Sequence, residues 1–387
     1  MRSYVHPDNS HLVYTDWREP DNRVEGFLRW LQWRMRYCDL DHYGPNNAYR
    51  DFYGMTNEQA HWFSVIFGMT YQSEMAWVIF SCFPDFAEID LNELDAWNRH
   101  NMPRMKYAKD TKYNKGHIVK QVESIMTATE SYGYSISKYV ESHLTDDANQ
   151  NFDTLYDSII NDFHKYGRMT TWLTLQTLYE TAGVNCYPNT LLAHDKSSWS
   201  VRFGLYYLYD LEHKIDKDNP GKLTDSDIQW ILNIEKTLYA QCERRIDKSD
   251  VSMFSYYLLE SQLCQYKKLM LGGDYAGHSS CDHISRASYL DDLWPEVDFS
   301  PFFNNVMNTL YHPLVRGKSE NKVLRHLTAK TGQMINMHDE FLDMPDMYKE
   351  LGINPSMVTN DPGDLKLLNS RIDEYIESER GLLGYMK

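Results

Sequence analysis

The stretch NFDTLYDSIINDFHKYGRMTTWLTLQTLYETAG, residues 151–183, is the part of the sequence that decides the fold class. Apolar residues recur in it at the three- to four-residue spacing of a helix, without the strict alternation that is typical of a strand. Gly167 interrupts the pattern and Gly183 ends it. The stretch therefore predicts two helices, 151–166 and 168–182, joined by a short turn.

The same periodicity extends over most of the chain in both directions. Capping residues are expected at Asn57, Asp225 and Asp250, each directly before or within the start of an apolar run. Further helices are predicted over residues 56–68, 73–83, 197–214, 224–245, 250–270, 301–310, 320–331, 339–351 and 364–380. No glycine-rich nucleotide motif, strand–helix alternation or internal repeat is found, so the sequence predicts an all-α, multi-helix globular protein.

Two polar stretches are candidates for a domain boundary: the charged residues 99–120 and the run SHLTDDANQN near residues 142–151. Boundaries fall preferentially in polar segments of this kind. We expect an N-terminal helical unit, residues 1–125, that ends in a basic and aromatic segment. A larger C-terminal unit, residues 126–387, would carry most of the candidate site residues.

Rings with polar tips are unusually frequent, since the chain has 29 tyrosines, 10 tryptophans and 15 phenylalanines. Tyrosine and tryptophan bury a flat face while keeping a hydrogen-bonding group available. Such rings also stack on nucleobases. An aromatic core explains most of them, and a base-stacking role for some remains open.

The formal net charge of −16 argues against a broad, non-specific nucleic-acid binder. One local exception is RHNMPRMKYAKDTKYNKGHIVK, residues 99–120, which is rich in lysine and arginine, contains one acidic residue and includes Tyr107 and Tyr113. Basic residues with interleaved rings suit a DNA backbone and its bases, although a solvated connector has the same composition. The DNA-binding candidates are Arg99, Arg104, Lys106 and Lys109.

The sequence indicates a cytoplasmic protein. It contains no apolar run long enough for a membrane span, and its start lacks the apolar core of a signal peptide. The six cysteines form no CxxC pair, so reduced thiols are expected.

The segment GRMTTWLTLQTLYETAG, residues 167–183, carries the first group of candidate site residues. Arg168, Trp172, Gln176 and Glu180 are spaced four residues apart, which places them along one slowly drifting stripe of a helix. A cation, a ring, an amide and a carboxylate on one face could line a polar pocket. The alternative is a solvent-facing stripe.

A second group, in HDKSSW, directly precedes the helix expected at 197–214. Asp195 and Lys196 lie directly before two serines, where exposed backbone N–H groups would favour an anion. A plain helix cap explains the same residues. In HPLVRGKSENK, Arg316 and Lys318 form a further candidate anion clamp, or a charged loop.

The third group lies in LGGDYAGHSSCDHISRASYLDDLWP, where a glycine-rich loop leads into a helix. Asp274 and Tyr275 occupy the loop, Asp282 could cap the helix, and Arg286 follows one turn later. His278, Cys281 and His283 match no recognised zinc spacing, so no metal site is predicted.

In their order along the chain, these segments resemble a family of bacteriophage DNA-modification enzymes, the amino acid:DNA transferases, also described as α-glutamyl/putrescinyl thymine pyrophosphorylases. The resemblance rests on HWFSVIFGMTYQSEMAWVIFSCFPD, GRMTTWLTLQTLYETAG, DYAGHSSCDHISRA and LDDLWPEVDF, and covers roughly residues 15 to 330. It implies a helical fold distantly related to helix-hairpin-helix DNA glycosylases, and a location in the cytoplasm of an infected bacterium.

The resemblance also implies a reaction. The substrate would be double-stranded phage DNA in which 5-hydroxymethyluracil carries a pyrophosphate ester, and the amine of a free amino acid, or putrescine, would replace the pyrophosphate. Such a site must neutralise pyrophosphate, orient an amine and exclude water, and a divalent cation could accompany the pyrophosphate.

The expected roles follow from that chemistry. Arg168 and Arg286 would bind pyrophosphate or the amino acid carboxylate, and Glu180 would accept a proton from the amine. Lys196 and Lys318 are additional phosphate candidates, and Trp172 and Tyr275 would stack on the extruded base.

Two other function classes remain open from the sequence. A glycosylase-like base-flipping enzyme would release a free base and need no amine. A non-enzymatic phage protein would use its tyrosines for a protein interface.

Overall fold

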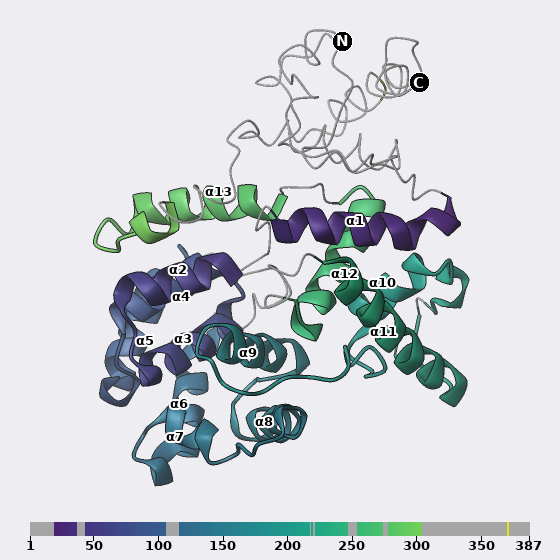
Figure 1. Ribbon diagram of the computed structural model, residues 1–387. Helices are drawn as coiled ribbons and strands as arrows, with labels where there is room; N and C mark the ends of the chain where they lie inside the picture. Colours follow the sequence, from purple (N-terminus) through teal and green to yellow (C-terminus); the bar gives the residue numbers. More distant parts are fainter. Residues whose placement is uncertain are drawn as a thin grey trace. The chain divides into compact units, whose positions relative to one another are not determined.

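The computed structural model describes residues 19–36, 43–105, 116–216, 218–219, 221–246, 254–273, 278–303 and 370 (Figure 1). All regular structure in these ranges is helical and no strand occurs among them, which confirms the predicted all-α fold. In the same ranges, no helix has the length and apolar character needed to cross a membrane. The helices predicted at 320–331 and 339–351 lie outside the described residues. Of those predicted at 301–310 and 364–380, only residues 301–303 and 370 are described, and these are helical.

The chain forms two compact units, and each combines segments that are distant in the sequence. The first unit takes its described residues from Met1–Asp39, Leu192–Asp282 and Leu310–Lys387, and the second from Leu40–Leu191 and His283–Thr309. Residue 125, the boundary predicted from the charge pattern, lies inside the second unit, within helix α6 (Ile118–Thr129).

The second unit is built around two buried helices, α3 (Asn57–Thr70) and α9 (Arg168–Glu180), which pack against each other (Figure 1). Helix α4 (Ser73–Cys82) packs on α3, and α8 (Ala148–Asp162) packs on α9. The remaining helices of this unit are α2 (Tyr43–Tyr53), η2 (Phe86–Glu88), α5 (Leu91–Asn101), α6, η4 (Glu130–Tyr132) and α7 (Ile136–Glu141). Residues 60–70 are all buried, as are residues 170–178, so α3 and α9 form the centre of this unit.

Gly68 allows α3 and α9 to approach closely. A Cβ atom at this position would lie 2.0 Å from Thr174 Oγ1 and 2.9 Å from the Thr170 carbonyl oxygen. Both distances are below van der Waals contact, so the crossing of the two helices requires glycine here.

Threonine side chains cap two of the helices, in each case one residue earlier than predicted. Thr56 caps α3 in a capping box with Gln59, and Thr224 caps α11 (Asp225–Arg245) in the same way with Asp227. Asn57 and Asp225 are instead the first helical residues, which corrects the two predicted caps. The cap predicted at Asp250 lies outside the described residues, and the next helix begins after Ser255.

The first unit contains η1 (Pro20–Asn22), α1 (Arg23–Arg36), α10 (Trp199–Leu208), η5 (Glu212–Lys214), α11 and α12 (Tyr256–Met270). Helix α10 packs on α12, where a Cβ atom at Gly204 would lie 2.8 Å from the Leu263 carbonyl oxygen. Helix α13 (His278–Leu293) belongs to the first unit up to Asp282 and to the second unit from His283 on.

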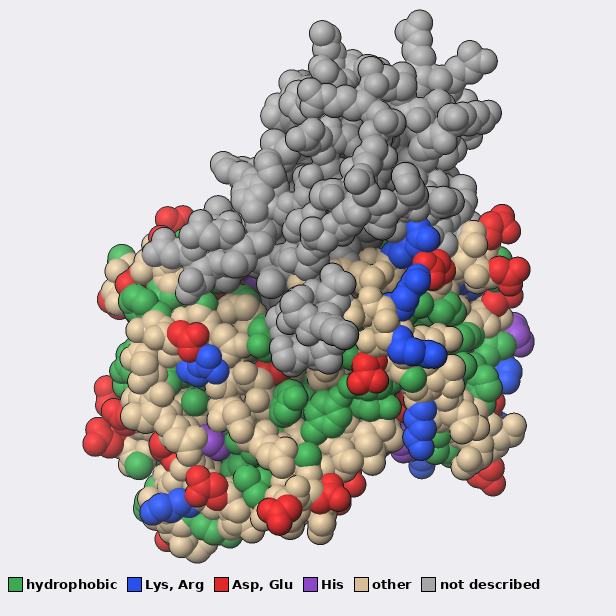
Figure 2. Space-filling view, in the orientation of Figure 1, with side chains coloured by type: hydrophobic (Ala, Val, Ile, Leu, Met, Phe, Trp, Pro, Cys, Tyr) green, Lys and Arg blue, Asp and Glu red, His purple; other side chains and the backbone are tan. Residues whose placement is uncertain are grey.

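The surface carries charges of both signs. Acidic and basic side chains are interspersed on the face drawn in Figure 2, despite the net charge of −16. The net charge of the chain is therefore compatible with local basic surfaces.

Candidate functional site

A carboxylate lies in the apolar interior of the second unit. Glu74 is the second residue of α4, and its side chain is 0% exposed. Residues 73–80 are all buried, so this helix offers the carboxylate no contact with solvent. Its position at the helix N-terminus favours a negative charge.

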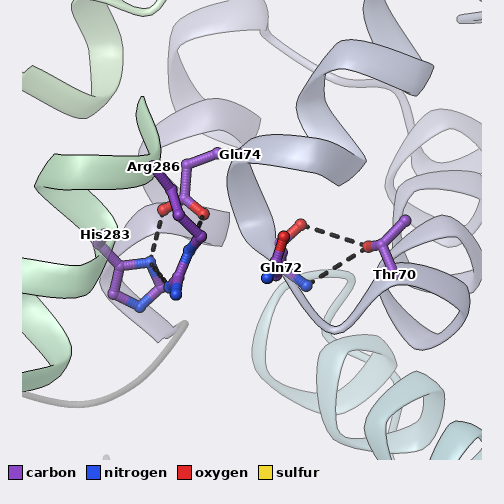
Figure 3. A network of polar contacts seen from close by, with 5 residues as sticks. All are labelled: Thr70, Gln72, Glu74, His283 and Arg286. Atoms are coloured by element: carbon purple, nitrogen blue, oxygen red, sulfur yellow. Dashed lines mark hydrogen bonds and ion pairs between the residues drawn. The ribbon is translucent and has the colours of Figure 1, made fainter. Parts of the chain in front are cut away.

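Two basic side chains from α13 hold this carboxylate (Figure 3). His283 Nδ1 lies 2.5 Å from Glu74 Oε1, and Arg286 Nε lies 3.3 Å from Glu74 Oε2. Arg286 NH2 also lies 3.1 Å from His283 Nδ1. We refer to Glu74, His283 and Arg286 as the Glu74 cluster.

The charge of Glu74 survives its burial. Burial alone raises the pKa of this carboxyl, but the nearby charges of His283 and Arg286 and the hydrogen bond from His283 outweigh it and bring the pKa to about 2. Glu74 is therefore ionised at neutral pH and accepts the hydrogen that His283 Nδ1 donates. Removing either basic partner would leave a buried charge poorly compensated.

The cluster reaches solvent through its arginine. The side chain of His283 is 6% exposed, whereas that of Arg286 is 25% exposed. An arginine that a carboxylate holds in place and whose side chain is partly exposed suits the binding of a phosphate or carboxylate. The arrangement predicts an anion subsite at Arg286.

Aromatic rings surround the cluster. Tyr49 stacks on Trp77 with ring centroids 4.7 Å apart, and Phe302 lies 6.2 Å from the His283 ring. Burial raises the pKa of Tyr49 well above its usual value, and the negative charge of Glu74 raises it further. The positive charge of Arg286 lowers this pKa in part. Its buried hydroxyl keeps its proton and has no hydrogen-bond partner among the described residues. Tyr49 is thus an available donor near the cluster.

Of the predicted catalytic residues, Arg286 lies in this cluster, and Asp282 lies one turn earlier on α13 with a half-buried side chain. Glu74 and Tyr49 were not among the residues predicted from the sequence, and the sequence pointed to His283 only as a metal ligand. One signal was present: between Glu58 and Asp85, Glu74 is the only residue among Asp, Glu, Lys and Arg. A lone charge in an apolar helix is costly unless the fold supplies partners.

The four residues of the predicted α9 stripe form two separate pairs. The Arg168 guanidinium carbon lies 5.4 Å from the Trp172 ring centroid, and Gln176 Nε2 donates to Glu180 Oε1 at 3.0 Å. Twelve residues of helix separate Arg168 from Glu180 by about 18 Å. One small pocket therefore does not contain both ends of the stripe.

The stripe faces the protein interior. Trp172 is 1% exposed and packs edge-on against Phe152, with ring centroids 5.6 Å apart. Gln176 is buried as well, while Arg168 and Glu180 are half-buried. In this arrangement Trp172 offers no free face for an incoming base, and we assign it a packing role.

Glu180 is the second carboxyl with a displaced pKa. Burial raises its pKa to about 8, and the hydrogen bond from Gln176 opposes that shift. The group is mainly protonated at neutral pH. It becomes an effective proton acceptor as the pH rises through about 8, or when a bound ammonium group stabilises its anion.

The candidates near HDKSSW belong to the first unit. Asp195 Oδ1 accepts a hydrogen bond from the Ser197 backbone N–H at 2.7 Å, and Lys196 is exposed. Helix α10 begins at Trp199, so these residues form the loop before it. Arg202 fixes this loop by donating to the carbonyl oxygens of Ala193 and Asp195.

Two DNA-binding candidates are described. Arg99 is exposed and pairs with Asp95 at 2.5 Å, while Arg104 is half-buried with its guanidinium 4.9 Å from the Trp294 ring centroid. The remaining candidates lie outside the described residues: Lys106, Lys109, Asp274, Tyr275, Arg316 and Lys318.

No metal centre is evident in the part of the chain that the structure describes. Within it, no three His, Cys, Asp or Glu side chains are grouped so that they could hold an ion. His283, once considered as a zinc ligand, donates to Glu74 instead.

Comparison with known proteins identifies the family. The family model described as amino acid:DNA transferase matches residues 46–275, which is more than half of the chain, and the chain belongs to this family. No curated protein and no solved structure matches it. The matched span contains Tyr49, Glu74 and α9 and ends before His283 and Arg286. Membership makes the protein a transferase with an amino acid and DNA as its substrates.

Proposed function

We propose that this member of the amino acid:DNA transferase family acts on 5-pyrophosphoryloxymethyluracil in double-stranded phage DNA. The amine of a free amino acid replaces the pyrophosphate in the cytoplasm of the infected bacterium. The Glu74 cluster supports this proposal, because its partly exposed arginine suits an anionic leaving group.

The reaction exchanges a carbon–oxygen bond for a carbon–nitrogen bond. The amine nitrogen forms a bond to the 5-methylene carbon, and pyrophosphate leaves with the electron pair of the C–O bond. The nitrogen then loses one proton. The site must therefore stabilise charge on the leaving group and provide an acceptor for that proton.

Arg286 is the residue that we assign to the leaving pyrophosphate. Its Nε is directed to Glu74 Oε2, which restricts the rotation of the guanidinium. Glu74 and His283 act as positioning residues behind it, and the Tyr49 hydroxyl is a candidate donor to the same anion. A divalent cation would enter together with the pyrophosphate, as part of the substrate.

The amine requires a separate carboxyl group. Glu180 is our candidate acceptor for its proton, and Arg168, at the other end of α9, is a candidate for an anionic group further along the substrates. The distance along α9 is compatible with the extent of a nucleotide and an amino acid bound together. We propose an amino acid as the donor, in agreement with the family, and putrescine as the alternative.

The experiment supplies purified protein with DNA that carries 5-pyrophosphoryloxymethyluracil and with a mixture of amino acids. Pyrophosphate release that requires an amino acid, together with an aminoalkylated thymidine in nucleoside mass spectrometry, is the expected result. Release of a free base would instead indicate a glycosylase. Recovery of unchanged or merely hydrolysed DNA would refute the transfer reaction proposed here.

Arg286→Ala tests the assignment of the site. Loss of a cation that stabilises a leaving group typically lowers turnover on the order of 10²-fold. Arg244→Ala serves as the control, because Arg244 is an exposed arginine on α11. Equal turnover of both variants would remove Arg286 from the site.

A further inference from the structure

Two histidines from separate segments meet in the second unit. His117 directly precedes α6, and His164 lies in the turn between α8 and α9. Their ring centroids are 5.5 Å apart, and the ring planes are inclined by 57°. The backbone N–H of His164 donates to Ser124 Oγ at 2.8 Å, which fixes the turn against α6.

The two rings retain hydrogen-bonding capacity that the described residues do not use. His117 Nδ1 and His164 Nε2 are buried, and neither has a hydrogen-bond partner within the described part of the chain. Buried polar atoms are normally paired, so two unpaired ring nitrogens in adjacent histidines indicate a missing partner.

The surroundings of the pair are cationic. Burial lowers the pKa of His164, and the charges of His117, Lys165 and Lys120 lower it further, with Glu123 opposing. Lys120 lies in the first turn of α6, whose N-terminus adds a partial positive charge. Lys165 is exposed and adopts a left-handed conformation with φ 61°, which is unusual for a residue other than glycine.

We propose that His117, His164, Lys120 and Lys165 form a phosphate-binding site. Its ligand is a phosphate group, either a phosphodiester of the DNA backbone or free pyrophosphate. The choice of these two phosphate sources rests on the proposed function, whereas the site itself is inferred from the histidine pair. Imidazolium and ammonium donors around a helix N-terminus provide the charge and hydrogen bonds that a phosphate requires.

Binding at this site is coupled to protonation. A phosphate next to His164 favours the imidazolium form and raises its pKa from the lowered value of the free protein. The additional affinity is present below the pKa of the bound state and is lost as the pH rises through it. Phosphate binding is therefore stronger at about pH 6 than at about pH 8, and a pKa change of one unit corresponds to a tenfold change in affinity.

The test compares wild type with a His117→Gln and His164→Gln double variant at these two pH values and constant ionic strength. One arm measures binding of a labelled, unmodified DNA duplex, and the other measures binding of inorganic pyrophosphate. We expect about tenfold weaker binding by the double variant at about pH 6 and little difference at about pH 8. His213→Gln, an exposed histidine of η5, is the matched control and should behave as wild type.

The two arms identify the source of the phosphate. A loss for the duplex alone assigns the site to the DNA backbone, and a loss for pyrophosphate alone assigns it to the leaving group. Unchanged binding of both ligands, with the pH dependence retained, would overturn the proposal. Neither arm requires turnover, so failure of the transfer reaction would not affect this binding result. Equally, failure of the binding test would not refute the transfer reaction.

Lys165→Gly provides a second variant in case the histidine variants do not fold. Glycine tolerates the left-handed conformation at φ 61°, so this change removes a cation without backbone strain. We expect weaker binding of the same ligand and a higher pKa of free His164 by NMR titration, because one repelling charge is gone. Unchanged affinity and an unchanged titration would contradict the proposed site.

Discussion

At the scale of single residues, the decisive feature is a carboxylate whose partners lie far away in the sequence. Glu74 and His283 are separated by 209 positions, so no local pattern could pair them. The sequence predicts Arg286 as a candidate site residue, from its place one turn after Asp282. Its contact with the buried Glu74 could not be predicted, because the pattern of a single sequence reports local periodicity and not tertiary contacts.

Glu74→Gln should weaken the second unit. The pKa of Glu74 is about 2 in the folded protein, below its ordinary value of 4.5, so its charge stabilises the fold above about pH 4.5. This contribution, on the order of 3 kcal/mol, is lost as the pH falls from about 4.5 to about 2. Urea unfolding over this pH range should show the loss in wild type and not in the variant. Exposed Glu93→Gln is the control, and an acid response shared by all three proteins would refute this account.

Glu180 should make turnover rise with pH. Its raised pKa of about 8 keeps the proton on the carboxyl at neutral pH, so the fraction able to accept a proton increases as the pH approaches 8. Glu180→Gln should abolish that limb of the pH–rate profile and leave DNA affinity unchanged. An identical profile in wild type and variant would exclude Glu180 as the acceptor.

At the scale of elements, the sequence predicted helices well where they contain an apolar run and a clear end. The helix predicted at 168–182 occurs as α9, Arg168–Glu180, because Gly167 and Gly183 bound it. The helix predicted at 197–214 is shorter, Trp199–Leu208, since Asp210 turns into the left-handed region with φ 56°. Helices α5 and α6 were not predicted, because both overlap the charged residues 99–120, which indicated a boundary between units.

Gly68→Ala should destabilise the crossing of α3 and α9. The new methyl group would collide with Thr174 Oγ1 and the Thr170 carbonyl oxygen, and a backbone atom cannot move aside at low cost. Overpacking of this kind costs about 1–3 kcal/mol. Gly44→Ala in α2 has open space around it and should leave the melting temperature unchanged or slightly raised. Equal melting temperatures of the two variants would show that the crossing adapts.

At the scale of the whole molecule, composition indicated the fold class but not how the chain divides. The charge pattern placed a boundary at residue 125, whereas the first unit joins segments from both sides of the second in the sequence. Such a division depends on which helices pack together, and a basic stretch alone carries no information about that packing. The candidate site could not be predicted for the same reason: its residues come from α4 and α13, which are far apart in the sequence.

The net charge of −16 makes DNA binding a question of local contacts. An acidic body repels the duplex, so we expect few phosphate contacts and a shallow dependence of affinity on salt, with a slope of about −0.9 per contact. Replacing Arg104, Lys106 and Lys109 with alanine should weaken DNA binding and reduce that slope.

Arg104 needs its own control, since its guanidinium packs on Trp294 and its loss removes packing as well as charge. A variant with only Lys106 and Lys109 replaced separates the two effects. If residues 99–120 contact DNA, replacing these two lysines is sufficient to lower both the affinity for DNA and the salt dependence of binding. If both quantities equal those of wild type while the triple variant is merely less stable, Lys106 and Lys109 do not contact DNA. The first place to look for the DNA backbone is then the pair of His117, at the end of this stretch, and His164.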